Sequence, residues 1–252
     1  MRYFIELSYF GKSYHGWQRQ PNAVTVQQTI EEALSTILRH DLKIMGAGRT
    51  DTGVHATQMY AHVDFDFENA PSSEDDLNKL THKLNRFLPP DIAIRSIFKV
   101  SNEAHTRFDA TARSYVYRVA LDKNPFTTDA AFYCKSPLDI DKMNSAAQIL
   151  MNYCDFECFS KSKTDVNTYL CNITEARWEE VENELEFHIT ADRFLRNMVR
   201  AIVGTLIEIG QGKQPVEWIH EVIASKTRGT AGTSVPAQGL YLTKIEYLKT
   251  IF

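Results

Sequence analysis

The chain has 252 residues, enough to bury a substantial core as one large domain or as two smaller ones. No apolar run approaches the roughly 20 residues that span a bilayer, and Glu6 interrupts the apolar start of the chain, so the sequence predicts a cytoplasmic protein rather than a membrane or secreted one. The net charge of −4 argues against a protein that binds nucleic acid through bulk positive charge, so any RNA contact requires locally clustered Arg and Lys.

The first part of the chain has the pattern of a strand, a loop and a helix. Residues 3–9 alternate apolar and polar side chains, which is the period of a strand. A polar and aromatic loop follows and is punctuated by Gly11 and Gly16. From Val26 onward the apolar residues recur at helical spacing, and Thr25 is a suitable N-cap for that helix.

Strands and helices continue to alternate up to residue 100. A short apolar segment at 42–45 leads into a glycine-rich loop at 46–56. Residues 61–67 alternate as expected for a half-exposed strand. The apolar spacing over 77–87 predicts a helix, and residues 92–100 form the next expected strand.

The second half repeats this alternation. The expected elements are strands over 115–121 and 185–191, helices over 143–150, 198–206 (ending at Gly210) and 218–223, and a last strand starting near Gly239. The polar segment 160–172 has no periodicity, which predicts a mobile loop. Because both halves alternate strands with helices and no long linker separates them, the sequence predicts an α+β fold of two sheet-and-helix halves around a shared cleft.

The four cysteines are typical of reduced structural thiols. They form no C-x-x-C pair, and His188 and His220 do not complete a zinc-binding spacing with them. No metal site is expected.

The loop at residues 46–56 carries the densest set of chemically active side chains. Its three glycines allow backbone conformations that other residues avoid, and they allow a substrate to approach closely. Between them lie the cation Arg49, the carboxylate Asp51 and two threonines, with His55 nearby. An ordinary solvated turn with Asp51 as turn former explains the residue types equally well.

The D-T-G at residues 51–53 also occurs in aspartic proteases, in which two carboxylates share one proton. The aspartate of those proteases follows apolar residues, whereas Arg49 and Thr50 precede it here. A nearby cation favours an ionised aspartate and opposes proton sharing. Since the chain has no second D-T-G, the sequence disfavours this interpretation.

The longer string G-R-T-D-T-G-V-H-A at 48–56 resembles the G-R-T-D-x-G-V-H-A signature of the TruA family of tRNA pseudouridine synthases. Four further segments resemble that family in the same order along the chain. They are Y-H-G-W-Q-R-Q at 14–20, A-R-S-Y-V-Y at 112–117, N-M-V-R at 197–200 with Gly204, and G-L-Y-L at 239–242. Together the segments span nearly the whole chain, which makes the resemblance far more specific than any one motif. Thr52, where many members have alanine, is a mild departure.

The chemistry of this family fits the residues in the loop. Pseudouridine formation breaks the N1–C1′ bond, turns the uracil over and rejoins it through C5, with no redox step, phosphate transfer or metal. No cofactor is therefore expected. A single ionised carboxylate near the sugar and the base can act as nucleophile or as electrostatic stabiliser. The resemblance assigns this role to Asp51 and leaves open whether it attacks the base or acts at the ribose.

The resemblance implies two further catalytic residues. Arg200 matches the family's arginine that pairs with the catalytic aspartate, and such a charge-assisted pair keeps the carboxylate ionised and aimed. Tyr115 matches the tyrosine that packs on the flipped uracil, either as a base for the C5 proton or as a stacking surface. From the residue types alone, a helix-surface arginine and a strand-face tyrosine are the alternatives.

The resemblance also implies RNA-binding residues. Arg49 matches the family arginine that fills the space left by the extruded base, and Leu240 is expected in the apolar wall of the uracil pocket. His105, Arg107 and Phe108 lie just before the Tyr115 strand, where the family contacts RNA, and a basic residue beside an aromatic suits phosphate and stacking contacts. Further candidates for local positive charge are Lys161, Lys163, Arg193 and Arg196.

The resemblance implies a pseudouridine synthase fold whose halves are residues 1–105 and 106–252, with a joined antiparallel sheet and a central active-site cleft. It implies a homodimer that modifies uridines 38, 39 and 40 in the anticodon stem–loop, with one tRNA spanning both subunits. A tRNA-binding protein without catalysis is the alternative of a different class. The complete set of Asp51, Tyr115 and Arg200 disfavours it.

Overall fold

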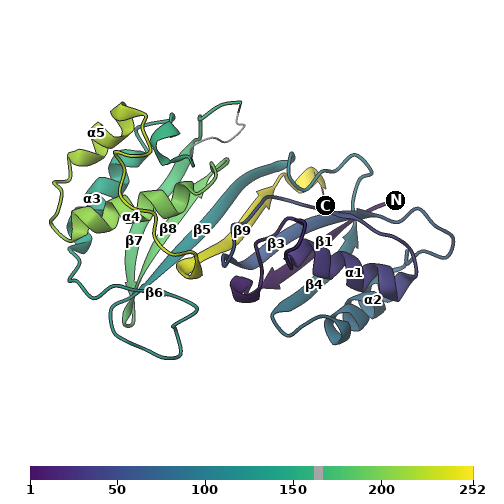
Figure 1. Ribbon diagram of the computed structural model, residues 1–252. Helices are drawn as coiled ribbons and strands as arrows, with labels where there is room; N and C mark the ends of the chain where they lie inside the picture. The colour runs from purple at the N-terminus through teal and green to yellow at the C-terminus, as the bar shows by residue number, and fades with distance from the viewer. Residues whose placement is uncertain (162–166, 252) are drawn as a thin grey trace. The chain divides into compact units, whose positions relative to one another are not determined.

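The computed structural model describes residues 1–161 and 167–251 (Figure 1). The chain forms two compact units, one made of Met1–Thr111 with Leu242–Phe252 and the other of Ala112–Tyr241. Five α-helices and mostly antiparallel strands make up the described residues, which confirms the predicted α+β class. No helix in the described ranges is long and apolar enough to cross a membrane.

The first unit is built around β1 (Arg2–Tyr9). This strand pairs antiparallel with β3 (His55–Asp64) on one side and with β4 (Ile92–Lys99) on the other. The short strand β2 (Ile44–Gly46) extends the sheet beside β3. The register of β1 shifts near Leu7 on both sides, so the strand is irregular where it approaches the loops at its end.

Two helices of the first unit pack beside each other, and each begins where a side-chain cap allows it to. In α1 (Val26–Leu38) the Thr25 hydroxyl accepts a hydrogen bond from the backbone N–H of Gln28 at 3.3 Å, as the sequence predicts. In α2 (Glu74–Phe87) the Ser73 hydroxyl plays the same part. This helix starts before the predicted residue 77 because its acidic first turn, which suits the helix dipole, lies outside the apolar stripe.

In the second unit, β8 (Glu184–Ala191) pairs antiparallel with β5 (Ala110–Ala120) and with β7 (Ile173–Val181). The remaining elements are β6 (Phe132–Tyr133), α3 (Ile140–Leu150), α4 (Met198–Gly210) and α5 (Trp218–Ser225). The chain enters this unit within β5 and leaves it within β9 (Leu240–Tyr247) (Figure 1). The predicted end of α4 at Gly210 is confirmed.

Several strands differ from the sequence-based expectation. β7 was not predicted, because a register shift between Ile173 and Glu175 interrupts its alternation and its far end is charged and exposed. The strand predicted over 61–67 runs instead from His55 to Asp64. The predicted mobile loop at 160–172 lies partly outside the described residues, together with Lys163.

The two units protect their edge strands in the same way. In the first unit the Asn85 side chain of α2 bonds both backbone groups of Ile94 in β4, at 2.8 Å each. In the second unit the Asn144 side chain of α3 bonds both backbone groups of Trp178 in β7, at 3.2 and 2.7 Å. Each asparagine thereby satisfies polar groups that an open sheet edge leaves exposed. This shared device accords with two similar halves.

Helix α4 packs so closely on the segment after α5 that its central glycine is testable. A Cβ at Gly204 would lie 1.8 Å from the carbonyl oxygen of Thr233. We expect Gly204→Ala to lower the free energy of unfolding by about 2 kcal/mol or more, because the backbones must separate. Urea unfolding measures this. Gly229→Ala is the control, since its nearest neighbour is the Thr227 methyl at 3.9 Å. Equal destabilisation by both variants would contradict the close contact.

Candidate active site

The loop that carries Asp51 connects β2 to β3 and ends in a tight turn. The backbone N–H of Ala47 donates to the Tyr60 carbonyl at 2.8 Å, and that of Val54 donates to the Asp51 carbonyl at 3.2 Å. Gly53 has φ of 79°, a left-handed conformation that favours glycine. Asp51 is half-buried and Arg49 is exposed. The turn therefore holds the backbone of Asp51 while leaving its side chain partly accessible.

The Y-H-G-W-Q-R-Q segment at residues 14–20 packs against the loop that carries Asp51. The backbone N–H of Trp17 donates to the Thr50 carbonyl at 3.2 Å, and the backbone N–H of Gly53 donates to the Tyr14 carbonyl at 3.3 Å. Gly16 has φ of 86°, and a Cβ there would lie 2.3 Å from the Thr50 carbonyl oxygen. The Y-H-G-W-Q segment and the loop at 46–56, which are separate motifs in the sequence, therefore form one structural unit.

Buried side chains complete the support of the loop. The Tyr9 and Thr50 hydroxyls lie 2.8 Å apart and are buried. His55 is only 1% exposed, and its Nδ1 accepts a hydrogen bond from the Gly11 N–H at 2.9 Å. Its ring stacks on Phe10 with centroids 4.1 Å apart. His55 therefore supports the loop as an acceptor and a packing surface, although its position in the motif suggested chemistry.

The turn before β5 presents an aromatic ring and a guanidinium to solvent. Phe108 is 74% exposed, and the Arg107 guanidinium lies 5.7 Å from its ring centroid. His105 is half-buried, and its Nδ1 accepts hydrogen bonds from the N–H groups of Arg107 and Phe108, at 3.1 and 3.3 Å. The Asp109 carboxylate accepts from the His105 N–H at 2.7 Å. His105 thus shapes the turn that displays the other two.

A buried histidine that sequence reasoning missed lies beneath this turn. The Nδ1 of His62 accepts from the Thr106 N–H at 3.3 Å, and its ring meets His105 edge-on at 4.7 Å. Desolvation, with the nearby Arg2 charge second, lowers the pKa of His62 to about 4. Desolvation also lowers the pKa of His105. Both rings are therefore neutral near pH 7, as acceptor nitrogens require.

In the second unit, Arg200 lies on α4 and Tyr115 on β5, and contacts with neighbouring residues hold both side chains. Arg200 lies in the first turn of α4, and its Nε donates to the Val235 carbonyl at 2.7 Å while Val235 N–H donates to the Arg200 carbonyl at 3.2 Å. Tyr115 lies in β5 opposite Ile189 and packs edge-on against Phe194, with ring centroids 5.1 Å apart. Both residues are half-buried.

Tyr117 of β5 holds the segment that leads to Leu240. The Tyr117 hydroxyl donates to the Pro236 carbonyl at 2.8 Å, and a Cβ at Gly239 would lie 2.7 Å from the Tyr117 ring. Leu240 begins β9 and is 6% exposed. The A-R-S-Y-V-Y strand therefore contacts the start of the G-L-Y-L segment through Tyr117, and Arg200 of N-M-V-R bonds Val235 just before that segment.

Polar and basic residues around the start of α4 differ in their exposure and in their hydrogen bonds. Asn197, with φ of 67°, precedes α4, and its amide donates to the Ser234 hydroxyl at 2.6 Å. Arg228 bonds the same hydroxyl at 2.7 Å and was not identified from the sequence. Arg196 is exposed, and its carbonyl accepts from the Lys161 N–H at 3.0 Å. Arg193 is half-buried.

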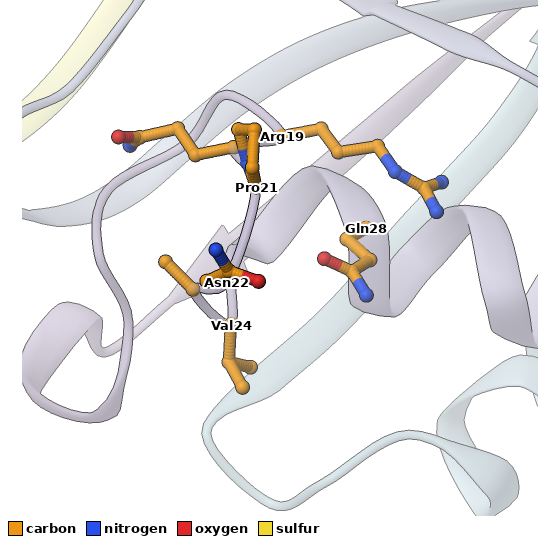
Figure 2. A pocket seen from close by; sticks show the side chains of 7 residues that line it. Arg19, Pro21, Asn22, Val24 and Gln28 are labelled. Carbon is orange, nitrogen blue, oxygen red and sulfur yellow. The ribbon is translucent and has the colours of Figure 1, made fainter.

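An open pocket lies beside the end of the Y-H-G-W-Q-R-Q motif (Figure 2). Its lining residues are Arg19, Gln20, Pro21, Asn22, Ala23, Val24 and Gln28. Asp51 does not line it.

Comparison with known proteins agrees with the motifs. A family profile described as tRNA pseudouridine synthase matches residues 7–109 and 146–248. The chain is 50% identical over 252 residues to tRNA pseudouridine synthase A of Bacteroides fragilis, covering 100% of this chain and 98% of that protein. It is 36% identical over 247 residues to the protein of the same name from Staphylococcus aureus, covering 97% and 91%. The chain therefore belongs to the tRNA pseudouridine synthase family, enzymes that isomerise uridine to pseudouridine in tRNA. Within that family it is similar to the A-type enzymes, which confirms the resemblance seen in the sequence.

The depressed pKa of His62 predicts a pH dependence of stability. The unfolded chain has a His pKa near 6.5, so as the pH falls the unfolded state binds the proton first. The contribution of neutral His62 is thus complete above about pH 6.5 and is lost between there and its folded pKa of about 4, at roughly 1.4 kcal/mol per pH unit.

Urea unfolding from pH 7 to pH 4.5 tests this expectation. We expect His62→Gln to show a shallower loss of stability than the parent, because the glutamine amide can still accept from Thr106 but does not titrate. His82→Gln, on the exposed side of α2, is the matched control and should retain the parent slope. An unchanged slope in His62→Gln would show that other groups cause the acid sensitivity.

Proposed function

We propose that this chain isomerises uridine to pseudouridine at positions 38, 39 and 40 of the tRNA anticodon stem–loop, with Asp51 as the catalytic carboxylate. The observation that carries the assignment of Asp51 is its half-buried position in a loop that two family motifs build together. Hydrogen bonds to the Thr50 and Asp51 carbonyls fix the backbone on both sides of its Cα. Such fixation aims a carboxylate before the substrate arrives.

The chemistry assigns Asp51 a role at the glycosidic bond. The N1–C1′ bond breaks, the uracil turns over, a C5–C1′ bond forms and C5 finally loses its proton. An ionised carboxylate supports these steps either by adding to the base or by acting at the ribose carbon. Arg49, exposed two residues before Asp51, is assigned to the space that the extruded uridine leaves in the stem.

Residues of the second unit are assigned to the same reaction from the resemblance. Arg200 is proposed to keep Asp51 ionised, and the bond from its Nε to Val235 fixes the plane of the guanidinium. Tyr115 is proposed to stack on the flipped uracil or to accept the C5 proton, and its contact with Phe194 restricts its ring. Leu240 is proposed as part of the apolar wall around the base.

The exposed turn before β5 is proposed to contact the RNA. Phe108 offers a ring for a nucleobase to stack on, and Arg107 beside it offers a phosphate contact. The contacts of His105 support a different role from the one expected from the sequence, namely holding these two residues in place. We also propose that the enzyme acts as a homodimer in the cytoplasm, as the resemblance implies.

Tritium release from tRNA labelled at uracil C5 tests the assignment of Asp51. We expect Asp51→Asn to lower release by at least about 10³-fold, because the neutral amide can neither attack nor stabilise positive charge. Affinity for tRNA should stay within a few-fold of the parent. Normal turnover by the variant would remove Asp51 from the mechanism. Tight binding without release by the parent chain would favour a binding protein without catalysis.

The role of Phe108 is tested by tRNA binding. We expect Phe108→Ala to weaken tRNA affinity by about 10-fold, the effect of losing one base-stacking contact, while the single-turnover rate at saturating tRNA stays within about 2-fold. Phe126→Ala is the matched control, since Phe126 is 93% exposed in the other unit. Equal affinity losses in the two variants would indicate non-specific loss of apolar surface.

A further inference from the structure

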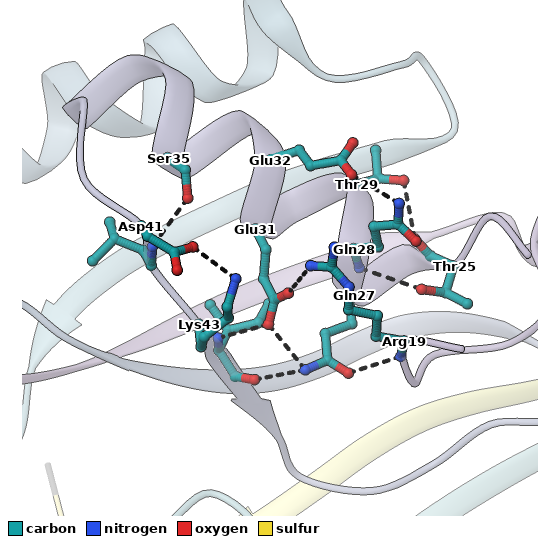
Figure 3. A network of polar contacts seen from close by, with 12 residues as sticks. Arg19, Thr25, Gln27, Gln28, Thr29, Glu31, Glu32, Ser35, Asp41 and Lys43 are labelled. Atoms are coloured by element: carbon teal, nitrogen blue, oxygen red, sulfur yellow. Dashed lines mark hydrogen bonds and ion pairs between the residues drawn. The ribbon is translucent and has the colours of Figure 1, made fainter. Parts of the chain in front are cut away.

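Two side chains one turn apart on α1 hold two distant segments of the chain (Figure 3). The Gln27 amide donates to the Ile44 carbonyl at 2.9 Å, and the Glu31 carboxylate accepts from the Ile44 N–H at 3.1 Å. The same two residues bind Arg19: Gln27 accepts from its N–H and Glu31 from its guanidinium, both at 3.0 Å. We call this the Gln27–Glu31 clamp.

The burial of Glu31 indicates that the clamp has a purpose beyond packing. Glu31 is 2% exposed, and one of its oxygens receives both the Ile44 N–H and the Gln27 amide at 3.1 Å. Removing a carboxylate from water carries a large desolvation cost, and an apolar side chain of similar volume would pack the helix without that cost. The carboxylate is compensated here only if Arg19 and Ile44 stay in place.

Both segments held by the clamp support the loop that carries Asp51. Ile44 begins β2, which runs directly into that loop at Gly46. Arg19 follows Trp17 by two residues, and Trp17 donates to the Thr50 carbonyl. The Trp17 indole also covers Gly46 so closely that a Cβ there would lie 2.3 Å from its Nε1. A shift at either end of the clamp therefore moves a support of the loop.

We propose that Glu31 is a positioning residue, which fixes the loop carrying Asp51 through Arg19 on one side and Ile44 on the other. The inference rests on the proposed catalytic role of Asp51. Glu31 lies on the helix and acts through backbone contacts of the loop, so its loss should affect the rate of the chemical step more than tRNA binding.

The chain contains a matched control on the same helix. Gln28 and Glu32 have the same residue types at the same spacing, and their side chains bond at 2.8 Å on the exposed side of α1 (Figure 3). A change at Glu32 alters helix charge and helix propensity as a change at Glu31 does. It leaves the Gln27–Glu31 clamp intact.

The test compares Glu31→Gln with Glu32→Gln. In Glu31→Gln the side-chain carbonyl can still accept the hydrogen bond from the Ile44 N–H. The NH₂ group then faces the Arg19 guanidinium, and because both groups are donors the ion pair with Arg19 is lost. At a temperature where circular dichroism shows each variant fully folded, we expect Glu31→Gln to lower kcat by about 10-fold or more, with KM for tRNA within about 3-fold. Glu32→Gln should leave both unchanged.

Arg19→Met removes the same ion pair by changing its partly exposed partner. It replaces Glu31→Gln as the test if that variant does not fold. We expect a loss of kcat of similar size, and a double variant no worse than the more impaired single one, because both changes remove one interaction. Additive losses would show that Arg19 and Glu31 act separately, and would overturn the inference.

Hydrogen–deuterium exchange of the peptide covering residues 46–54 measures how firmly the backbone of the loop is held. We expect faster exchange in Glu31→Gln than in the parent, Glu32→Gln or Asp51→Asn. A parent-like kcat in folded Glu31→Gln, with or without faster exchange, overturns the positioning role. Parent-like kcat in Asp51→Asn overturns instead the assignment of Asp51, while the exchange result still reports on the clamp.

Discussion

The backbone contact between Gly16 and Thr50 is the constraint on which the site in the first unit depends. Only a residue without Cβ fits there, because a Cβ would lie 2.3 Å from a carbonyl oxygen and φ is 86°. Because the backbone fixes the position of a Cβ, no side-chain rotation can relieve its clash with this carbonyl oxygen. The close approach lets Trp17 bond Thr50 and cover Gly46, and the Gln27–Glu31 clamp secures the far ends of both segments. The loop that carries Asp51 is thus fixed through its backbone.

Neutral imidazoles serve this unit as hydrogen-bond acceptors. Nδ1 of His55, His62 and His105 each accepts a hydrogen bond from a backbone N–H, and the rings of His62 and His105 meet edge-on. An acceptor role requires the unprotonated ring, which agrees with the lowered pKa of His62 and His105. The three rings therefore help to hold backbone turns of this unit, and the turn that His105 shapes exposes Arg107 and Phe108.

An overall negative charge is compatible with an RNA substrate because the charge is unevenly distributed. The hairpin of β7 and β8 carries five glutamates within residues 179–186. The turn at residues 105–108 carries instead an exposed ring beside a guanidinium. An exposed guanidinium beside an exposed ring offers RNA a phosphate contact and a stacking contact at this turn, whatever the net charge of the chain.

The sequence by itself determined the family, the α+β class, the Thr25 cap and the end of α4 at Gly210, because caps, helical periods and motif strings are local. It also predicted Asp51 as the catalytic carboxylate and residues 46–56 as the loop that carries it. It missed β7, where a register shift hides the alternation, and the buried Glu31 and His62. Only the tertiary structure decided that the Y-H-G-W-Q segment supports the loop that carries Asp51. It also showed that His105, which was predicted to bind RNA, accepts the hydrogen bonds that shape the turn at residues 105–108. Side-chain periodicity reports burial within one element, whereas these contacts join residues far apart in the chain.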